Sequence, residues 1–414
     1  MTVALLKYYE RNQQKSQTKF MKTGYSIRTW RMRLVCPEPI WLARTEEYFQ
    51  NVVEFYYHLL RQHEELWNSS LFDIQRSLEL LTLTGRDGRQ PTNPLPMGKV
   101  PVYLRRAAIN KASATVKSTQ ELQSGFPEKL EAKVTFFKGM YSDLTDRSIC
   151  LKLWNGEKWI WTDCNLKGRP FPQDGQLMSP TLVKEGRRYL LNIPVKQENS
   201  DARTAKERMA EGTNLCSVRF TNTDTFAVCC ILDEQGKQLA VHTCRGGDAY
   251  RHRCKLLETR IQKSRPNTVG DNSPQPNRKY YIHLKNLSEH YAHQVSREIL
   301  NFCKENQAGI IVLPDYDQNF TRMAMVKSGN FSPLHLSSKI RTNLQYKAWA
   351  EGILVLETRT DGLKDKCAIC GGKVRRKGNE FLCENGHQGN RFLNDARNLG
   401  RKCQDSFFRG SRTK

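Results

Sequence analysis

The sequence predicts a multidomain α+β protein, in which a β-barrel interrupted by helices precedes an α/β domain with a small metal-binding hairpin. Three observations support this prediction. The first half has one early strand, a helical segment and then a run of strands. From residue 215 the pattern is three strands, a long helix, a strand, a helix and a strand. Near the C-terminus, three cysteines and a histidine occur at the spacing of zinc ligands.

The net charge indicates a polyanionic partner. The 414 residues include 66 Lys and Arg against 42 Asp and Glu, which gives a net charge of +24. This excess favours nucleic acid over a membrane, because no basic amphipathic anchor is evident. No apolar run is long enough to span a membrane, and the run at 3–6 is too short for a signal peptide. The 13 cysteines are an odd and scattered set, which is typical of reduced thiols, so we expect a cytoplasmic protein with no membrane partner.

A polar, basic tail at 1–25 leads into the first strand, which lies within 26–40. This strand alternates between apolar residues and arginines, so one face is buried and the other carries Arg31 and Arg33. We expect these two arginines to contact nucleic acid.

A helical lobe is predicted at 41–127. Apolar residues recur at helical spacing over 45–81, and a further helix with basic positions is predicted at 102–118. Arg105 and Arg106 of that helix are further candidates for contact with nucleic acid.

The remainder of the barrel, which we expect to be of the oligonucleotide-binding type, is predicted at 128–198. Its clearest element is a hairpin in which Asn155 and Gly156 separate two alternating runs. Asn-Gly supplies the positive φ angles of a two-residue turn. Residues 199–213 are polar and predict a linker.

The α/β domain is predicted at 214–364, and its order of strands and helices is that of the RNase H superfamily. A basic run, offset by Glu258, lies between the three strands and a loop at 264–278. We expect its cations to neutralise phosphates, although a solvated charged face is the alternative. These cations are Arg251, Arg253, Lys255, Arg260 and Lys263.

A zinc-binding hairpin is predicted at 365–390, followed by a C-terminal helix and tail at 391–414 that complete the α/β domain. The candidate ligands are Cys367, Cys370, Cys383 and His387. Three thiolates and one imidazole complete a tetrahedral shell, and a closed shell is typical of structural Zn²⁺. A short basic hairpin has little core without a metal, which favours this interpretation over four unrelated buried residues.

The second half resembles the RuvC portion of the TnpB proteins of transposons and of their relatives, the compact type V CRISPR effectors. The resemblance rests on the order of motifs over about 210–405, which includes the strand meander, "HYAHQVSREILNFCKENQAGIIVLPDYD", "SSKIRTNLQYKAWAEGILVLE", the CxxC hairpin and "NRFLNDARNLGRK". The first half is similar, more loosely, to the wedge barrel and the recognition lobe of that family. The resemblance implies a guide RNA and a double-stranded DNA target as partners.

In that family, an Asp, a Glu and an Asp hold two metal ions that cleave DNA, and only carboxylates hold such hard cations well. At the matching positions this sequence has Phe220, Pro314 and Phe392. The nearby acids, which are candidates for displaced ligands, are Asp224, Asp315 and Asp395. Asp395 is the best of them, because it lies three residues past its expected position on the same helical face.

We therefore expect a nuclease-inactive, RNA-guided DNA-binding protein rather than an enzyme. Its output would be occupancy of the target, which blocks transcription or recruits a partner such as a sigma factor or the transposition machinery. Two alternatives stay open at this point. One is an active metal-dependent endonuclease with displaced carboxylates, and the other is a transposon-associated DNA-binding protein that needs no guide RNA.

Overall fold

The structure is a computed structural model, and it describes most of the chain. The described residues are 24–85, 87–122, 124–172, 174–199, 201, 203–263, 277–316 and 332–408. The expected basic tail at 1–25 and the expected loop at 264–278 therefore lie almost wholly outside the described residues. The chain divides into two compact units, of which the first is Ile27–Gln197 and the second contains Glu198–Lys414.

The first unit is built on a seven-stranded sheet with the order β2-β3-β4-β1-β7-β5, in which β6 also pairs with β7. Among the described residues this pairing runs as an open path. Its strands are β1 (Tyr25–Val35), β2 (Tyr141–Ser142), β3 (Ser148–Trp154), β4 (Trp159–Lys167), β5 (Gln176–Leu177), β6 (Thr181–Glu185) and β7 (Arg188–Glu198).

Strand β1 has the alternation that the sequence predicts. Met32 and Leu34 are buried, whereas the alternating residues Arg31 and Arg33 are exposed. The apolar side packs into the core of the first unit, so the arginines occupy the outer face of the strand.

The hairpin at Asn155 is confirmed, but its turn is longer than expected. Trp154 pairs with Trp159, which leaves four residues in the connection rather than two. The side-chain Oδ1 of Asn155 accepts hydrogen bonds from the backbone N–H groups of Glu157 and Lys158, each at 2.8 Å. The Asn155 side chain thus accepts the hydrogen bonds of backbone N–H groups that the partner strand does not reach. Within this turn only Gly156 has a positive φ angle, which is 112°.

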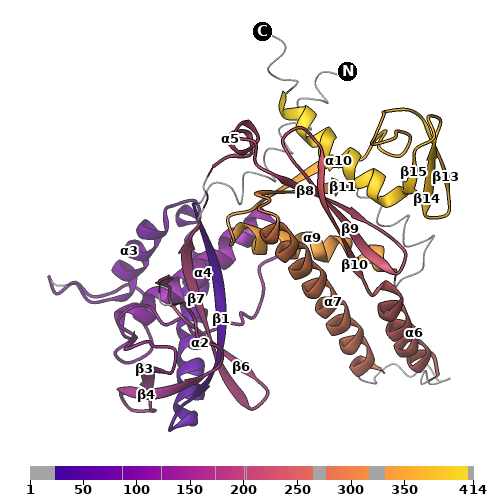
Figure 1. The fold of residues 1–414 in the computed structure, drawn as a ribbon. Coiled ribbons are helices and arrows are strands. Elements are labelled where there is room, and N and C mark those ends of the chain that lie inside the picture. The colour runs from indigo at the N-terminus through magenta and orange to yellow at the C-terminus, as the bar shows by residue number, and fades with distance from the viewer. Residues whose placement is uncertain are drawn as a thin grey trace. The chain divides into compact units, whose positions relative to one another are not determined.

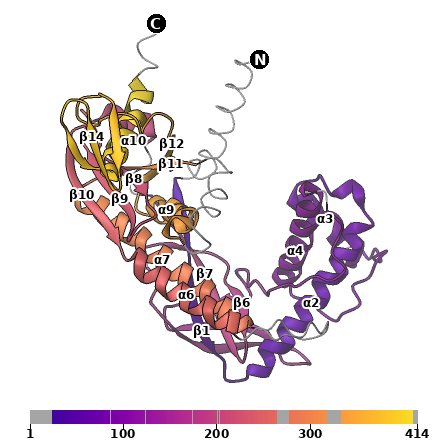
Figure 2. The same cartoon turned by 90° about the vertical axis from the view of Figure 1, so that its right-hand side faces the viewer.

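Three helices form the rest of the first unit, and they pack together as one group (Figure 2). They are α2 (Pro39–Arg61), α3 (Leu71–Thr82) and α4 (Val102–Glu121), with a short turn η1 (Glu64–Leu66) after α2. The apolar spacing over 45–81 predicts one continuous helical segment, but in the structure the α-helix is broken at 62–70. A new helix starts there because the Ser70 hydroxyl accepts a hydrogen bond from the N–H of Asp73.

The second unit contains a five-stranded sheet with the order β10-β9-β8-β11-β12. The first three strands form an antiparallel meander, and β11 and β12 extend it in parallel to β8. The strands are β8 (Leu215–Phe220), β9 (Thr225–Leu232), β10 (Gln238–Arg245), β11 (Ile310–Asp315) and β12 (Leu354–Arg359). The order of these elements along the chain is the one predicted from residue 215.

Helices cover both faces of this sheet (Figure 1). One face packs against α6 (Gly247–Lys263), α7 (Arg278–Glu305), the short η2 (Pro333–Leu336) and α9 (Ser337–Trp349). The other face packs against α5 (Ala205–Ala210) and α10 (Arg391–Phe408). Because side chains alternate along each strand, the two faces supply two separate cores. No helix in the described part of the chain combines the length and apolar character needed to cross a membrane.

The segment 199–213 differs from the expected linker, because it carries α5 and packs onto the second unit. Thr204 and Glu207 cap α5 reciprocally. Arg208 of this helix is 0% exposed. Its guanidinium donates to the backbone carbonyls of Gly309 and Gly352, each at 2.7 Å. The polar composition of this segment thus reflects caps and a buried arginine.

Candidate metal centre and nucleic-acid-binding surfaces

The four predicted zinc ligands are brought together by a small antiparallel sheet. Its strands are β13 (Val374–Lys377), β14 (Glu380–Cys383) and β15 (Gln388–Asn390). The ligand atoms of Cys367, Cys370, Cys383 and His387 all lie within 4.8 Å of one another. The tight turns after the cysteines use Gly371 and Gly386, whose φ angles of 77° and 84° favour glycine.

The surroundings of these four residues fit a metal cation. The N–H groups of Ile369 and Asn385 lie 3.4 Å from the sulfurs of Cys367 and Cys383. A hydrogen bond from the Asn385 side chain lowers the pKa of the Cys370 thiol to about 6, which favours the thiolate form that binds metals. The Nδ1 atom of His387 is buried and has no hydrogen-bond partner among the described residues. An orphaned imidazole nitrogen beside three sulfurs is the arrangement expected of a fourth ligand.

Helix α10 holds the hairpin that carries the candidate metal ligands in place through its polar face. The Asn394 side chain accepts from the N–H of Ala368 at 2.8 Å and donates to the carbonyl of Lys366 at 2.9 Å. Asn398 donates to the same carbonyl at 2.8 Å. Arg376 of β13 pairs with Asp395. The motif "FLNDARN" therefore has a clear structural role in docking the hairpin.

The three positions at which the sequence predicts lost carboxylates are buried. Phe220, at the end of β8, is 3% exposed, and Phe392, at the start of α10, is 9% exposed. Pro314 near the end of β11 is also buried. Phe220 and Pro314 line one small cavity of about 20 Å³ together with residues of α9, whereas Phe392 does not line it. The structure thus brings two of the three positions together at one cavity.

The three acids considered as candidates for displaced ligands do not converge on this cavity. Asp395 is 2% exposed and lies between two arginines, at 3.3 Å from Nε of Arg219 and in contact with Arg376. Asp224 is exposed, and its carboxylate accepts from the N–H of Asp248 at 3.1 Å. Asp315 is half-buried at the end of β11. None of these three acids lines the cavity beside Phe220.

Cationic and hydroxyl groups stand around this cavity instead. Its other lining residues are Tyr316, Ser337, Ser338 and Arg341. Arg219 donates to the Tyr316 hydroxyl at 2.8 Å, and Arg341 lies 3.3 Å from the carboxylate of Glu357. Burial raises the pKa of Glu357. The Glu357 carboxylate is therefore paired with an arginine, and its raised pKa disfavours the charged form that a divalent cation needs.

The predicted nucleic-acid contacts of the first unit fall into two groups. Arg31 and Arg33 are exposed on β1, although Arg31 pairs with Glu185. Arg105 is only 7% exposed and lies 3.0 Å from the carboxylate of Glu79. This burial corrects the interpretation of Arg105, because its guanidinium is used in a buried ion pair. The neighbouring Arg106 shares the same carboxylate but its side chain is 44% exposed.

The predicted basic run of the second unit forms helix α6. Its buried side consists of Tyr250, Cys254, Leu257 and Ile261. The exposed side carries four of the five predicted cations, Arg253, Lys255, Arg260 and Lys263. The fifth, Arg251, is half-buried and pairs with Asp248, an acid that the sequence interpretation did not weigh.

Sequence reasoning missed a second cluster of possible metal ligands. His242, Cys244 and Glu298 come from β10 and α7, and their ligand atoms lie within 4.8 Å of one another. The His242 Nε2 atom lies 2.6 Å from the Glu298 carboxylate, so a histidine–glutamate ion pair accounts for most of this contact. Residues 56 positions apart give no spacing signal, and only the pairing of β10 with α7 brings them together.

Solved structures with the same arrangement decide the fold. Cas12f1, in a complex with a single guide RNA and target DNA, aligns with a TM-score of 0.52 and 12% identity, covering 91% of this chain and 99% of that one. The mini-RNA-guided endonuclease Cas-phi3 aligns with a TM-score of 0.51 and 9% identity, covering 95% and 97%. This chain has the fold of the compact type V CRISPR effectors.

The type V effector fold thus extends over nearly the whole chain, and the mixed α/β architecture predicted from the sequence is confirmed at that level. Residues 26–155, which lie mostly in the first unit, match the sequence profile of the Aq_aa04 family. No curated protein sequence is a significant match.

Proposed function

We propose that this protein binds a guide RNA and a complementary DNA target without cleaving the DNA. The observation that carries the proposal is the cavity beside Phe220 and Pro314, where a fold shared with RNA-guided effectors has no carboxylate among the lining residues. In this proposal the five-stranded sheet is the RuvC-like domain. The seven-stranded sheet is the wedge barrel, and α2, α3 and α4 form the recognition lobe.

The architecture of the second unit supports the RuvC-like assignment. A meander of three antiparallel strands continues into two parallel strands, with helices on both faces, as in RNase H-like domains. The net charge of +24 supports a nucleic-acid partner, because phosphate neutralisation supplies most of the affinity in such proteins. Guide RNA would supply the sequence specificity through base pairing.

The dimensions of the cavity support the absence of cleavage. Two metal ions about 4 Å apart, with their water ligands, stabilise the attacking and leaving oxygens at phosphorus. The cavity volume of about 20 Å³ is enough for roughly one water molecule. Its cationic neighbour Arg341 would also repel a divalent ion.

In the same proposal, Cys367, Cys370, Cys383 and His387 hold one structural Zn²⁺. A closed set of four ligands leaves no open position for catalysis, so the metal would stabilise the hairpin that docks on α10. Without cleavage, the output is occupancy of the DNA target. Occupancy blocks transcription or recruits a protein partner.

The first experiment is to purify the chain from cells and sequence the RNA that copurifies. A defined RNA with a variable segment is expected, and DNA that matches this segment should bind at least about tenfold more tightly than a scrambled duplex. Binding of DNA with no copurified RNA would instead support the DNA-binding protein that needs no guide.

The second experiment tests cleavage with the same ribonucleoprotein. Supercoiled DNA that carries the matched target is incubated with Mg²⁺ or Mn²⁺, and nicked and linear products are measured. We expect binding without either product. Metal-dependent nicking of the matched target would overturn the nuclease-inactive assignment and support displaced carboxylates.

A further inference from the structure

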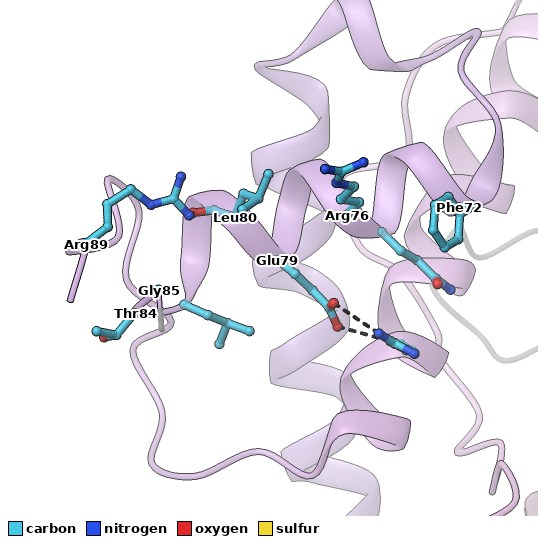
Figure 3. Close-up of a pocket in the computed structure, with 10 residues that line it drawn as sticks. Phe72, Arg76, Glu79, Leu80, Thr84, Gly85 and Arg89 are labelled. Carbon is cyan, nitrogen blue, oxygen red and sulfur yellow. Dashed lines mark hydrogen bonds and ion pairs between the residues drawn. The ribbon is translucent and has the colours of Figure 1, made fainter. Parts of the chain in front are cut away.

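A pocket in the first unit combines an exposed aromatic ring with arginines (Figure 3). Its volume is about 320 Å³, and it is lined by α3, the loop that follows α3, and one residue of α4. This volume lies at the lower end of the range of about 300–1,000 Å³ for small-molecule sites. The pocket is therefore large enough for a single nucleotide-sized group.

The outer side of α3 has an unusual composition for a solvated helix surface. Phe72, Arg76 and Leu80 are spaced four residues apart and form one stripe. Phe72 is 71% exposed and Leu80 is 46% exposed. The buried side of the helix already has its own apolar residues, Ile74 and Leu78. The core thus does not need Phe72 or Leu80, and their exposure leaves an apolar surface on both sides of an arginine.

The charge around this stripe is positive. Glu79 accepts hydrogen bonds from Arg105 at 3.0 Å and from Arg106 at 3.2 Å, so one carboxylate serves two guanidinium groups. Arg89 donates to a backbone carbonyl of α3 at 3.1 Å. Arg76 has no ion-pair partner among the residues that the structure describes.

The nearby acids do not reverse this balance. Apart from Glu79, the acids next to the stripe and in the loop after it are Asp73 and Asp87, and neither of them lines the pocket. Asp73 bonds to Ser70 at the start of α3, and Asp87 accepts from the N–H of Arg89 at 3.3 Å. Glu79 is therefore the one acid among the lining residues.

We propose that this pocket binds a single unpaired nucleotide of a nucleic-acid strand. The base stacks on Phe72, and the guanidinium groups of Arg76 and Arg106 contact the adjoining phosphate. The proposal rests on the proposed function to the extent that the chain binds nucleic acid, and it adds an unpaired base as a ligand. Aromatic stacking combined with cationic side chains is the usual means by which proteins hold single strands.

The same features are less suited to a peptide. A docked helix or strand needs a groove that extends over several residues, whereas this pocket is confined to α3, the loop that follows it and one residue of α4. Arginines are preferred where planar groups and phosphates are bound, because the guanidinium is planar and has several donors. An acidic peptide is thus an alternative outcome of the test.

The test uses the full chain and a short fluorescent oligouridine that carries one 5-iodouridine. Photo-excited iodouracil cross-links to an aromatic ring on which it stacks, so the cross-linked peptide should contain Phe72. Phe72→Leu should weaken oligouridine binding by about 5- to 100-fold, the range for loss of one stacked base. Phe72→Tyr keeps the ring and should keep both affinity and cross-link. Because Phe72 is 71% exposed, neither variant should change the thermal unfolding temperature, which is measured as a control.

Three results would overturn the inference. They are a wild-type chain that does not bind oligouridine, equal binding by wild type and Phe72→Leu, and competition for the pocket by an acidic peptide but not by oligouridine. Binding of the guide-matched DNA is measured in parallel on the same variants. If matched DNA still binds and the Phe72→Leu variant binds oligouridine as tightly as wild type does, the pocket inference fails alone and the proposed function stands. If copurified RNA and matched binding are both absent, the proposed function fails, and a Phe72 cross-link would still support the pocket.

Discussion

Removal of three charges from α6 is expected to change the salt dependence of nucleic-acid binding. The variant is Arg253→Gln, Lys255→Gln and Arg260→Gln in one chain. All three side chains are exposed, and the opposite side of the helix packs into the core. Arg253 and Arg260 are seven residues apart, which is about two turns, so they lie above each other on one face. Arg251 is left unchanged, because Asp248 already pairs with it.

The magnitude follows from counterion release. Each phosphate that is neutralised contributes about 0.7 to the slope of log affinity against log salt for a single strand and about 0.9 for a duplex. If each of the three side chains contacts one phosphate, the slope should decrease by about 2.1–2.7. A fourfold increase in salt would then weaken the wild type about 20- to 40-fold more than it weakens the variant.

The assay is fluorescence anisotropy of a labelled duplex matched to the guide, titrated at several salt concentrations. The matched control is the charge-conserving triple Arg253→Lys, Lys255→Arg and Arg260→Lys, which should keep the wild-type slope. Preference for the matched over the mismatched target should not change in either variant, because base pairing sets it. A neutral triple that retains the wild-type slope would refute the reasoning and identify this side of α6 as an ordinary solvated surface.

Three further predictions concern stability, metal and catalysis. Arg208→Met should cost about 3–5 kcal/mol in denaturant unfolding, because it removes the donor to the Gly352 carbonyl, one of two donors to the Gly309 carbonyl and the cation that pairs with Asp201, whereas Arg203→Gln at an exposed ion pair should cost less than about 1 kcal/mol; equal costs would contradict this role. Wild type should contain about one zinc per chain by elemental analysis, and Cys383→Ser should lose it while Cys403→Ser, a buried cysteine outside the hairpin, should keep it. Full zinc retention in His387→Ala would remove His387 from the ligand set. Restoring acids by Phe220→Asp, Pro314→Glu and Phe392→Asp together should not produce Mg²⁺-dependent nicking, because Phe392 does not line the cavity shared by the other two positions; nicking by this variant would show that the site is intact apart from its ligands.

Much of the architecture could be predicted because the signals were local. The alternation in β1 and the helical period of α7 depend on residues a few positions apart, and both reappear as burial patterns. The grouping of the four candidate metal ligands could also be predicted from their spacing, because they lie in two short turns of one hairpin.

The parts that could not be predicted depend on tertiary contacts. Arg105 and Arg106 look equivalent in sequence, but only the packing of α4 against α3 buries the first and exposes the second. The sequence places Asp395 close to an expected ligand position, but it does not indicate that Arg219 and Arg376 contact the carboxylate in the folded chain. The pocket on α3 has no spacing signal, because its arginines come from α3, a loop and α4.

The burial of Arg208 bears on where the second unit can be cut from the rest of the chain. A fragment that begins at 214 would contain all five strands of the sheet, yet it would lack the guanidinium that donates to the Gly352 carbonyl before β12 and is one of two donors to the Gly309 carbonyl before β11. The loss of these hydrogen bonds in a buried region destabilises the fold, so this fragment should be prone to aggregate. A fragment that begins at 198 retains α5 and should fold as a cooperative unit. In physical terms, the second unit starts at the helix that carries this arginine and not at its first strand.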